Sequence, residues 1–80
     1  HCVASYESSC ASGRSSIWSL SLERSDGRRK RVLTIEVSNQ RKTICQVRGK
    51  ANRLPNHKEL ELIKRWAKQE QLGIDGHIAP

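Results

Sequence analysis

The stretch SIWSLSLERSDGRRKRVLTIEV, residues 16–37, decides the fold that the sequence predicts. Apolar and polar residues alternate on both sides of Asp26-Gly27, a dipeptide typical of tight hairpin turns. Alternation with a period of two places every second side chain on the same face of a strand. We therefore predict two antiparallel strands, residues 16–23 and 31–38, joined by a charged loop.

A third strand is predicted over residues 42–48, after a turn at Asn39 and Gln40. Its sequence, KTICQVR, again alternates. Strict alternation places Ile44 on the same face as Gln46 and Arg48. The three strands then form an antiparallel meander with one apolar face and one polar face.

The C-terminal part of the chain predicts a helix over residues 56–72, followed by a tail, residues 73–80. Asn56 and Glu59 have the spacing of a capping box, with Asn in place of Ser or Thr. The apolar residues that follow recur at helical spacing and are Leu60, Ile63, Trp66 and Ala67.

The N-terminal residues 1–12 also predict a helix, because Cys2, Tyr6 and Cys10 are spaced four residues apart. The predicted fold class is therefore α+β. A three-stranded antiparallel meander is flanked by N- and C-terminal helices in the order α-β-β-β-α, with both helices on one sheet face.

Length and charge restrict the function. Eighty residues make a single small domain, and 15 Lys and Arg against 8 Asp and Glu give a net charge of +7. This excess favours an anionic partner, nucleic acid before an anionic membrane. The longest apolar run is far shorter than the roughly 20 residues of a membrane span. We therefore expect a soluble cytoplasmic domain that does not enter a membrane.

The chain starts at His1 and contains no Met, so we expect it to be part of a longer protein, whose remainder is a further partner. Its oligomeric state does not follow from the sequence. The three cysteines have no regular spacing, and neither a CxxC nor an HxxxH motif is present. Reduced thiols, no metal site and no cofactor are the expectation.

Two basic stretches are candidate nucleic-acid-binding sites. The first, QVRGKANR, ends the third strand, and Gly49 within it permits a bend or a positive φ. Its guanidinium, ammonium and amide side chains suit phosphate and base edges; they are Gln46, Arg48, Lys50, Asn52 and Arg53. The second is the hairpin loop, which suits contacts to the phosphate backbone through Arg28, Arg29, Lys30 and Arg31. A solvated strand end and an ordinary charged loop are the alternatives.

The predicted order of elements is also that of double-stranded-RNA-binding domains. Those domains grip phosphates with basic residues at the start of the final helix. Here Glu59 and Glu61 occupy that region, so the resemblance is one of topology only.

A second resemblance rests on motifs. HCVASY at the start, GRSSIWSL at the first strand and QVRGKANRLP after the third strand resemble the PcfJ-like family. The family pattern of His-Cys-Val with a nearby Tyr, then Gln-x-Arg-Gly-x-x-Asn, falls here on His1, Cys2, Val3 and Tyr6, then Gln46, Arg48, Gly49 and Asn52. The matching pieces span residues 1 to about 72. Because such proteins are encoded on conjugative plasmids and other mobile elements, the resemblance implies a role around their DNA. It implies no reaction.

Three functions follow as hypotheses. The first is a basic nucleic-acid-binding module of a mobile-element protein. The second is an enzyme acting on a phosphodiester or nucleotide, for which His1, Cys2 and Arg48 are weak catalytic candidates; Cys2 lies on the apolar stripe and also fits a buried structural role. The third is a protein-docking domain of a conjugation complex. The sequence does not decide whether the chain is an enzyme.

Overall fold

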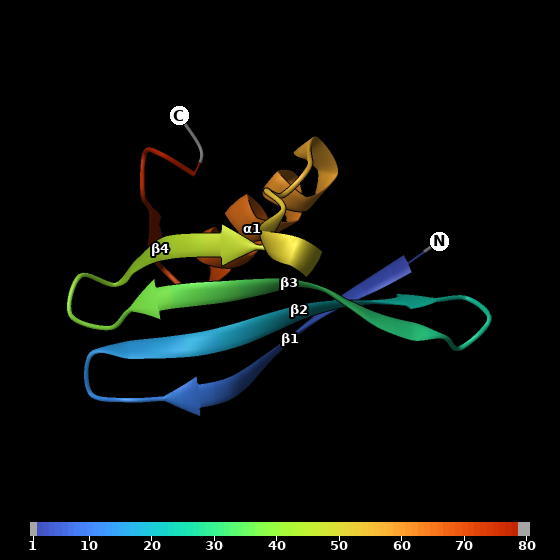
Figure 1. Ribbon diagram of the computed structural model, residues 1–80, viewed down its shortest axis with the longest axis horizontal. Helices are drawn as coiled ribbons and strands as arrows, with labels where there is room; N and C mark the ends of the chain where they lie inside the picture. The colour runs from blue at the N-terminus through green and yellow to red at the C-terminus, as the bar shows by residue number, and fades with distance from the viewer. Residues whose placement is uncertain (1, 79–80) are drawn as a thin grey trace.

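The computed structural model describes residues 2–78, with the backbone alone at Cys2, Cys10 and Ala11. Within these residues the chain forms one sheet and one α-helix (Figure 1). The elements in chain order are β1 (Cys2–Ala11), β2 (Ser15–Arg24), β3 (Arg29–Ser38), β4 (Thr43–Arg48), the 3₁₀ turn η1 (Lys50–Asn52), α1 (His57–Gln69) and β5 (Gly73–Ile74).

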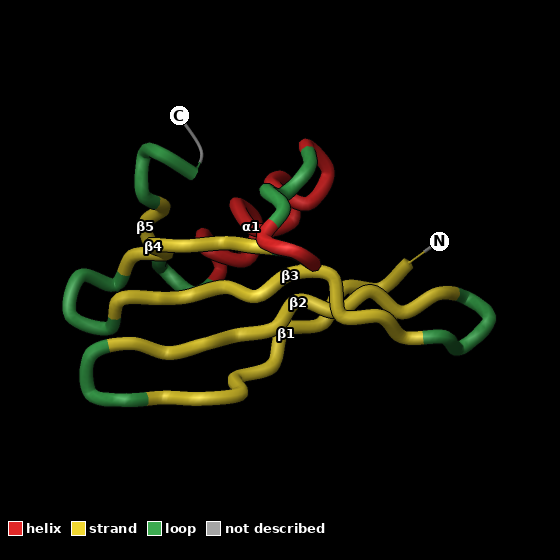
Figure 2. The backbone as a smooth tube through the Cα atoms, viewed as in Figure 1, coloured by secondary structure: helices red, strands yellow, loops and turns green. Residues whose placement is uncertain are grey.

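The sheet keeps the strands in chain order, β1-β2-β3-β4-β5. β1 to β4 pair antiparallel, whereas β5 lies parallel to β4 (Figure 2). A parallel neighbour needs a crossover, which α1 supplies between β4 and β5. The predicted three-stranded meander between two helices is therefore wrong: the structure has a five-stranded mixed sheet and one helix.

The largest correction concerns residues 1–12, which were predicted as a helix. Residues 2–11 are the edge strand β1, paired with β2 along almost its whole length from Cys2↔Arg24 to Ala11↔Ser16. Ala4 and Tyr6 point to the face that α1 covers, and Val3 is exposed. The apolar signal of this strand is weak because one of its faces is polar. Pairing of β1 with β2 satisfies the backbone N–H and C=O groups along that edge of β2, and this pairing makes residues 2–11 a strand.

The predicted hairpin between β2 and β3 is confirmed. Gly27 has φ +87°, its N–H donates to Arg24 O at 3.0 Å, and Asp26 Oδ1 accepts from Arg28 N at 3.0 Å. Glycine takes this left-handed conformation without steric cost. The hairpin extends to one extremity of the molecule, whose longest dimension is 39 Å (Figure 1).

The predicted capping box of α1 is also confirmed. Asn56 Oδ1 accepts from Glu59 N at 2.8 Å, and Glu59 Oε1 accepts from Asn56 N at 2.9 Å. The helix ends at Gln69, and Gln71 takes a left-handed conformation at φ 59°. Part of the predicted tail then forms β5, which the sequence did not reveal because two residues are too few to show alternation.

A bulge changes the faces of β4. Glu36 pairs with Gln46 but the next residue of β3, Val37, pairs with Ile44, so β4 has one extra residue at this point. Ile44 and Val47 consequently both face the core and are fully buried. Placing Ile44 on the polar face with Gln46 and Arg48 was wrong, because a bulge shifts the alternation by one residue.

The core lies between the sheet and α1. The buried residues of the strands are Leu20, Leu33, Ile35, Val37, Ile44 and Val47, and those of the helix are Ile63, Trp66 and Ala67. Trp66 stacks on Tyr6 with ring centroids 4.8 Å apart and meets the edge of Trp18 at 5.2 Å. The Tyr6 hydroxyl donates to Leu62 O at 3.0 Å. These aromatic contacts join α1 to β1 and β2.

No helix within residues 2–78 has the length and apolar character needed to cross a membrane.

Candidate nucleic-acid interface

A cleft with three cations opens where β3 begins and β4 ends. Its volume is about 350 Å³. The polar side chains that line it, named here the basic cleft, belong to Arg31, Thr34, Arg48 and Lys50. Val32, Leu33 and Gly49 complete the lining. Three cations around one small cleft have the chemistry that can hold an anionic group such as a phosphate.

Sheet register brings these residues together. Thr34 of β3 lies opposite Arg48 of β4 in the antiparallel ladder. Arg31, three residues before Thr34, therefore lies near the residues that follow Arg48. There the chain turns through η1, where Ala51 and Asn52 have φ of 56° and 64°. The turn keeps Lys50 at the mouth of the cleft.

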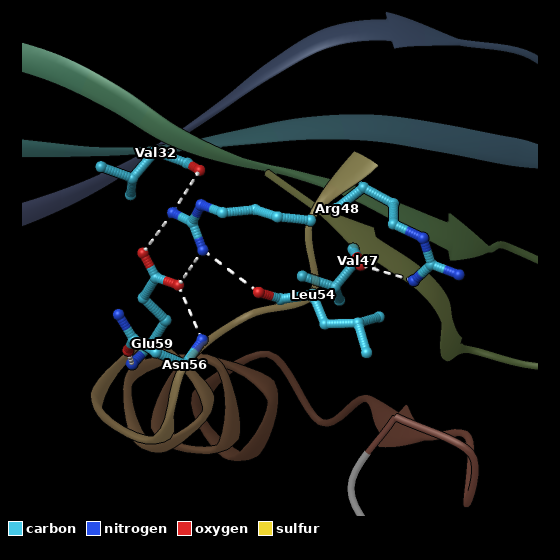
Figure 3. A network of polar contacts seen from close by, with 7 residues as sticks. Val32, Val47, Arg48, Leu54, Asn56 and Glu59 are labelled. Carbon is cyan, nitrogen blue, oxygen red and sulfur yellow. Dashed lines mark hydrogen bonds and ion pairs between the residues drawn. The ribbon is translucent and has the colours of Figure 1, made fainter. Parts of the chain in front are cut away.

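The guanidinium of Arg48 is only partly engaged. Its Nη1 donates to Val47 O at 2.8 Å, and the side chain is half-buried (Figure 3). Arg48 forms no ion pair among the described residues. A guanidinium carries five N–H donors, so Arg48 keeps donors available for a ligand.

Arg53 has a different position from the one predicted. Its Nη1 and Nη2 donate to the two oxygens of Glu59, each at 2.9 Å. Nη1 also donates to Leu54 O at 3.2 Å, and Nη2 donates to Val32 O at 3.5 Å. Val32 is on β3 and Glu59 lies in the first turn of α1, so the guanidinium connects the sheet to the helix (Figure 3). We name this set the Arg53–Glu59 clasp.

The clasp shifts the pKa values of both of its charged groups. Glu59 is 5% exposed, and the hydrogen bonds from Arg53 lower the pKa of its carboxyl. The same hydrogen bonds raise the pKa of Arg53. A carboxylate buried at a helix N-terminus with a bidentate arginine is fully satisfied. Arg53 therefore contributes to the contact between sheet and helix, and it does not line the basic cleft.

Gly49 also has a packing role. Its φ is −100°, so the positive φ that the sequence allowed is not used here. A Cβ at this position would lie 2.8 Å from the Cγ, Nε and Cζ of Arg53. The glycine is needed because the Arg53 side chain passes directly over it. The positive φ falls instead on Ala51 and on Asn52, a residue type that tolerates the left-handed region.

The remaining residue of the first stretch, Gln46, is exposed on the polar face of the sheet, opposite Glu36. It shares that face with Arg48, as predicted, but does not line the basic cleft. Of the five candidates in residues 46–53, the structure brings Arg48 and Lys50 together with Arg31. It leaves Gln46 and Asn52 outside this group and engages Arg53 elsewhere.

A second cleft lies along the β2–β3 hairpin and has a volume of about 530 Å³. Four basic residues line it, namely Arg24, Arg28, Arg29 and Lys30, together with Leu22 and Val32. Val32 lines both clefts. The two clefts share this residue, and we name the cations of both clefts together the basic strip.

Two cations of the basic strip have acidic partners. Arg28 pairs with Asp26 at 3.7 Å, and both groups are exposed. Arg29 reaches across the sheet to Glu7 and donates to Ser5 Oγ at 2.9 Å. The cations of the strip that form no ion pair within residues 2–78 are Arg24, Lys30, Arg31, Arg48 and Lys50. The predicted site did not include Arg24 or Thr34. Thr34 could have been found by pairing the two predicted strands, because it lies opposite Arg48.

The described residues give little support to the predicted catalytic residues. His1 and the side chain of Cys2 lie outside the described part of the chain. Cys45 contacts Glu36 O and Oε2 at 3.5 Å, and burial, followed by this hydrogen bond, raises the pKa of its thiol. Across residues 2–78, no three His, Cys, Asp or Glu side chains gather as metal ligands would.

The fold and the strip together describe a small α+β domain with a basic surface at one end of its sheet. A family model, PcfJ-like protein, matches residues 1–63. The chain belongs to the PcfJ-like family. This confirms the resemblance drawn from the HCVASY and QVRGKANRLP motifs. No curated protein and no solved structure matches the chain.

Proposed function

We propose that this chain binds nucleic acid through the basic strip, as a module of a protein that acts on the DNA of a mobile element. The observation that carries the proposal is the basic cleft. Arg31, Arg48 and Lys50 line this one cleft and form no ion pair among the described residues. Like charges are held together at a cost, which an anionic ligand removes.

The hairpin extends the same argument. It projects beyond the rest of the sheet, so its cations and those of the basic cleft can contact phosphates some distance apart along one backbone (Figure 1). Phosphate contacts of this kind provide affinity without reading sequence. The PcfJ-like family membership supports the mobile-element context.

The test is a titration of labelled oligonucleotides followed by fluorescence anisotropy at several salt concentrations. With four or five phosphate contacts, the logarithm of the affinity falls with the logarithm of salt with a slope of about −4. We expect Arg31→Glu with Lys50→Glu to weaken binding at least tenfold and to flatten the slope by about 2.

The matched control is Arg14→Glu with Lys68→Glu, which changes the net charge equally at exposed positions outside the basic strip. This control should bind within about threefold of the unchanged chain. If it weakens binding as much as the cleft variant, the interaction depends on total charge and not on this site. Absence of binding at 50 mM salt would exclude the proposed function altogether.

A further inference from the structure

A second concave surface lies between the edge strand β1 and the helix α1. Its volume is about 690 Å³, the largest of the clefts described here. Its apolar residues come from both walls and are Ala4, Tyr6, Leu22, Leu62 and Trp66. We name it the strand–helix groove. Two of these residues, Tyr6 and Trp66, stack on each other, and Trp18 meets the Trp66 ring edge-on.

The strand beside the groove has an open edge. β1 is the first strand in the sheet, and within residues 2–78 no strand pairs with its outer side. Edge strands expose backbone N–H and C=O groups that can template a further strand, and natural edges are usually kept short or protected by Lys or Pro. β1 has ten residues, CVASYESSCA, and neither Lys nor Pro. One bulge, at Ser9, is its only irregularity among the described pairs.

Charge indicates what can bind here. Lys58 and Arg65 of α1 lie on the groove, are exposed, and form no ion pair among the described residues. The acidic groups beside them are engaged: Glu61 with Lys64 at 3.9 Å, and Glu59 in the Arg53–Glu59 clasp. A second copy of the chain carries the same net charge of +7 and is repelled. An acidic partner is attracted.

We propose that the strand–helix groove binds an extended acidic peptide segment of a partner protein. The segment adds to β1 as a further strand of the sheet. It places an apolar side chain over Tyr6 and Leu62, and acidic side chains toward Lys58 and Arg65. Addition of a strand beside a helix-bordered groove uses backbone hydrogen bonds for affinity and the groove for selectivity. This site is separate from the basic strip and does not depend on the proposed nucleic-acid binding.

The test uses a synthetic seven-residue peptide in which aspartate alternates with valine and leucine. Trp66 lines the groove, so tryptophan fluorescence reports binding. We expect saturable binding that weakens at least tenfold when alternate backbone nitrogens of the peptide are methylated, because methylation removes the strand hydrogen bonds. A peptide with lysine in place of aspartate should bind at least tenfold more weakly.

Two protein variants locate the site. Arg65→Glu should weaken binding of the acidic peptide at least fivefold, whereas Lys68→Glu, an equal charge reversal on the same helix but away from the groove, should leave it unchanged. Hydrogen exchange of the unchanged chain should show slower exchange at β1 amides when the peptide is present, a readout that needs no variant.

Other outcomes overturn the proposal. Equal binding of the methylated peptide excludes strand addition. Loss of binding in Arg31→Glu with Lys50→Glu, together with protection at the β2–β3 hairpin, assigns the peptide to the basic strip. Dimers in sedimentation, with β1 amides protected in the absence of peptide, make a second copy the occupant of the edge.

Discussion

Arg48 and Arg53 are five residues apart in one basic stretch, yet they have different environments. Among the described residues, the Arg48 side chain donates a hydrogen bond to Val47 O and borders an open cleft, whereas Arg53 holds the buried carboxylate of Glu59. Sequence alone grouped them because their charges are the same. Arg53 is engaged because the first turn of α1 places Glu59 next to it. The position of that turn relative to the strands follows from the folded structure and not from residue type.

The two arginines should therefore separate in experiment. Arg53→Ala leaves Glu59 buried in the first turn of α1 without its main partner, so the free energy of unfolding should fall clearly in urea titrations. Arg48→Ala should cost about 1 kcal/mol, close to the net contribution of a typical single hydrogen bond, while weakening oligonucleotide binding. If Arg48→Ala is the more destabilising of the two, the Arg53–Glu59 clasp does not make the larger contribution to stability.

Gly49 provides a second residue-level prediction. Gly49→Ala places a Cβ 2.8 Å from the Arg53 side chain, so that side chain or the backbone at residue 49 must shift and the contacts of Arg53 with Glu59 are disturbed. Forced displacement of packed atoms typically costs about 1–3 kcal/mol. Gly13→Ala is the matched control, because a Cβ there meets nothing within 4 Å and Gly13 has no positive φ. Thermal unfolding of both variants checks the difference, and equal melting temperatures would contradict it.

Acid should weaken the clasp. Hydrogen bonds from Arg53 lower the pKa of Glu59 below its value in the unfolded chain. The stabilisation is then complete above the unfolded pKa of about 4.3 and is lost as the pH falls through the lower, folded pKa. Unfolding by urea between pH 6 and pH 2.5 measures this loss. In Glu59→Gln, the loss of unfolding free energy between pH 6 and pH 2.5 should be smaller. An unchanged pH profile would show that other carboxylates cause the loss.

At the scale of elements, α1 depends on aromatic packing more than on the sequence of its exposed face. Trp66 is 6% exposed and contacts both Tyr6 of β1 and Trp18 of β2. Trp66→Ala should cost about 3–5 kcal/mol, which is a large part of the stability of so small a domain. Leu54→Ala, at an apolar residue that is 68% exposed, should be close to neutral. Chemical denaturation of both variants tests whether α1 is anchored here.

The elements also show what sequence reasoning could reach. Turn and cap chemistry is local, so Asp26-Gly27 and the Asn56–Glu59 box were readable directly. The edge strand β1 was not, because a helix and a strand both accommodate an apolar residue at every fourth position, here Cys2, Tyr6 and Cys10. Pairing with β2 across the sheet, a tertiary effect, decides between them.

At the scale of the whole molecule, the excess of basic residues was evident from composition, but its distribution was not. Charge counts could not distinguish cations with partners, such as Arg29 and Arg53, from those without, such as Arg31 and Lys50. The bulge in β4 and the turn through η1 determine which side chains converge. Both depend on backbone conformations, among them the left-handed Ala51, that residue type alone does not predict.

The strand order of the sheet has a consequence for how the chain reaches its native state. β1 to β4 pair with their sequence neighbours through short turns, so their closure needs little loop entropy and hairpins can form within microseconds. β5 pairs with β4 only after α1 has crossed the sheet. We expect β5 to form last and to open first, so that native-state exchange at Gly73 and Asp75, whose N–H groups donate to Lys42 O and Ile44 O, precedes exchange at the β2–β3 ladder. Slower exchange at these two amides than in the centre of β3 would reverse that order and make the crossover an early event.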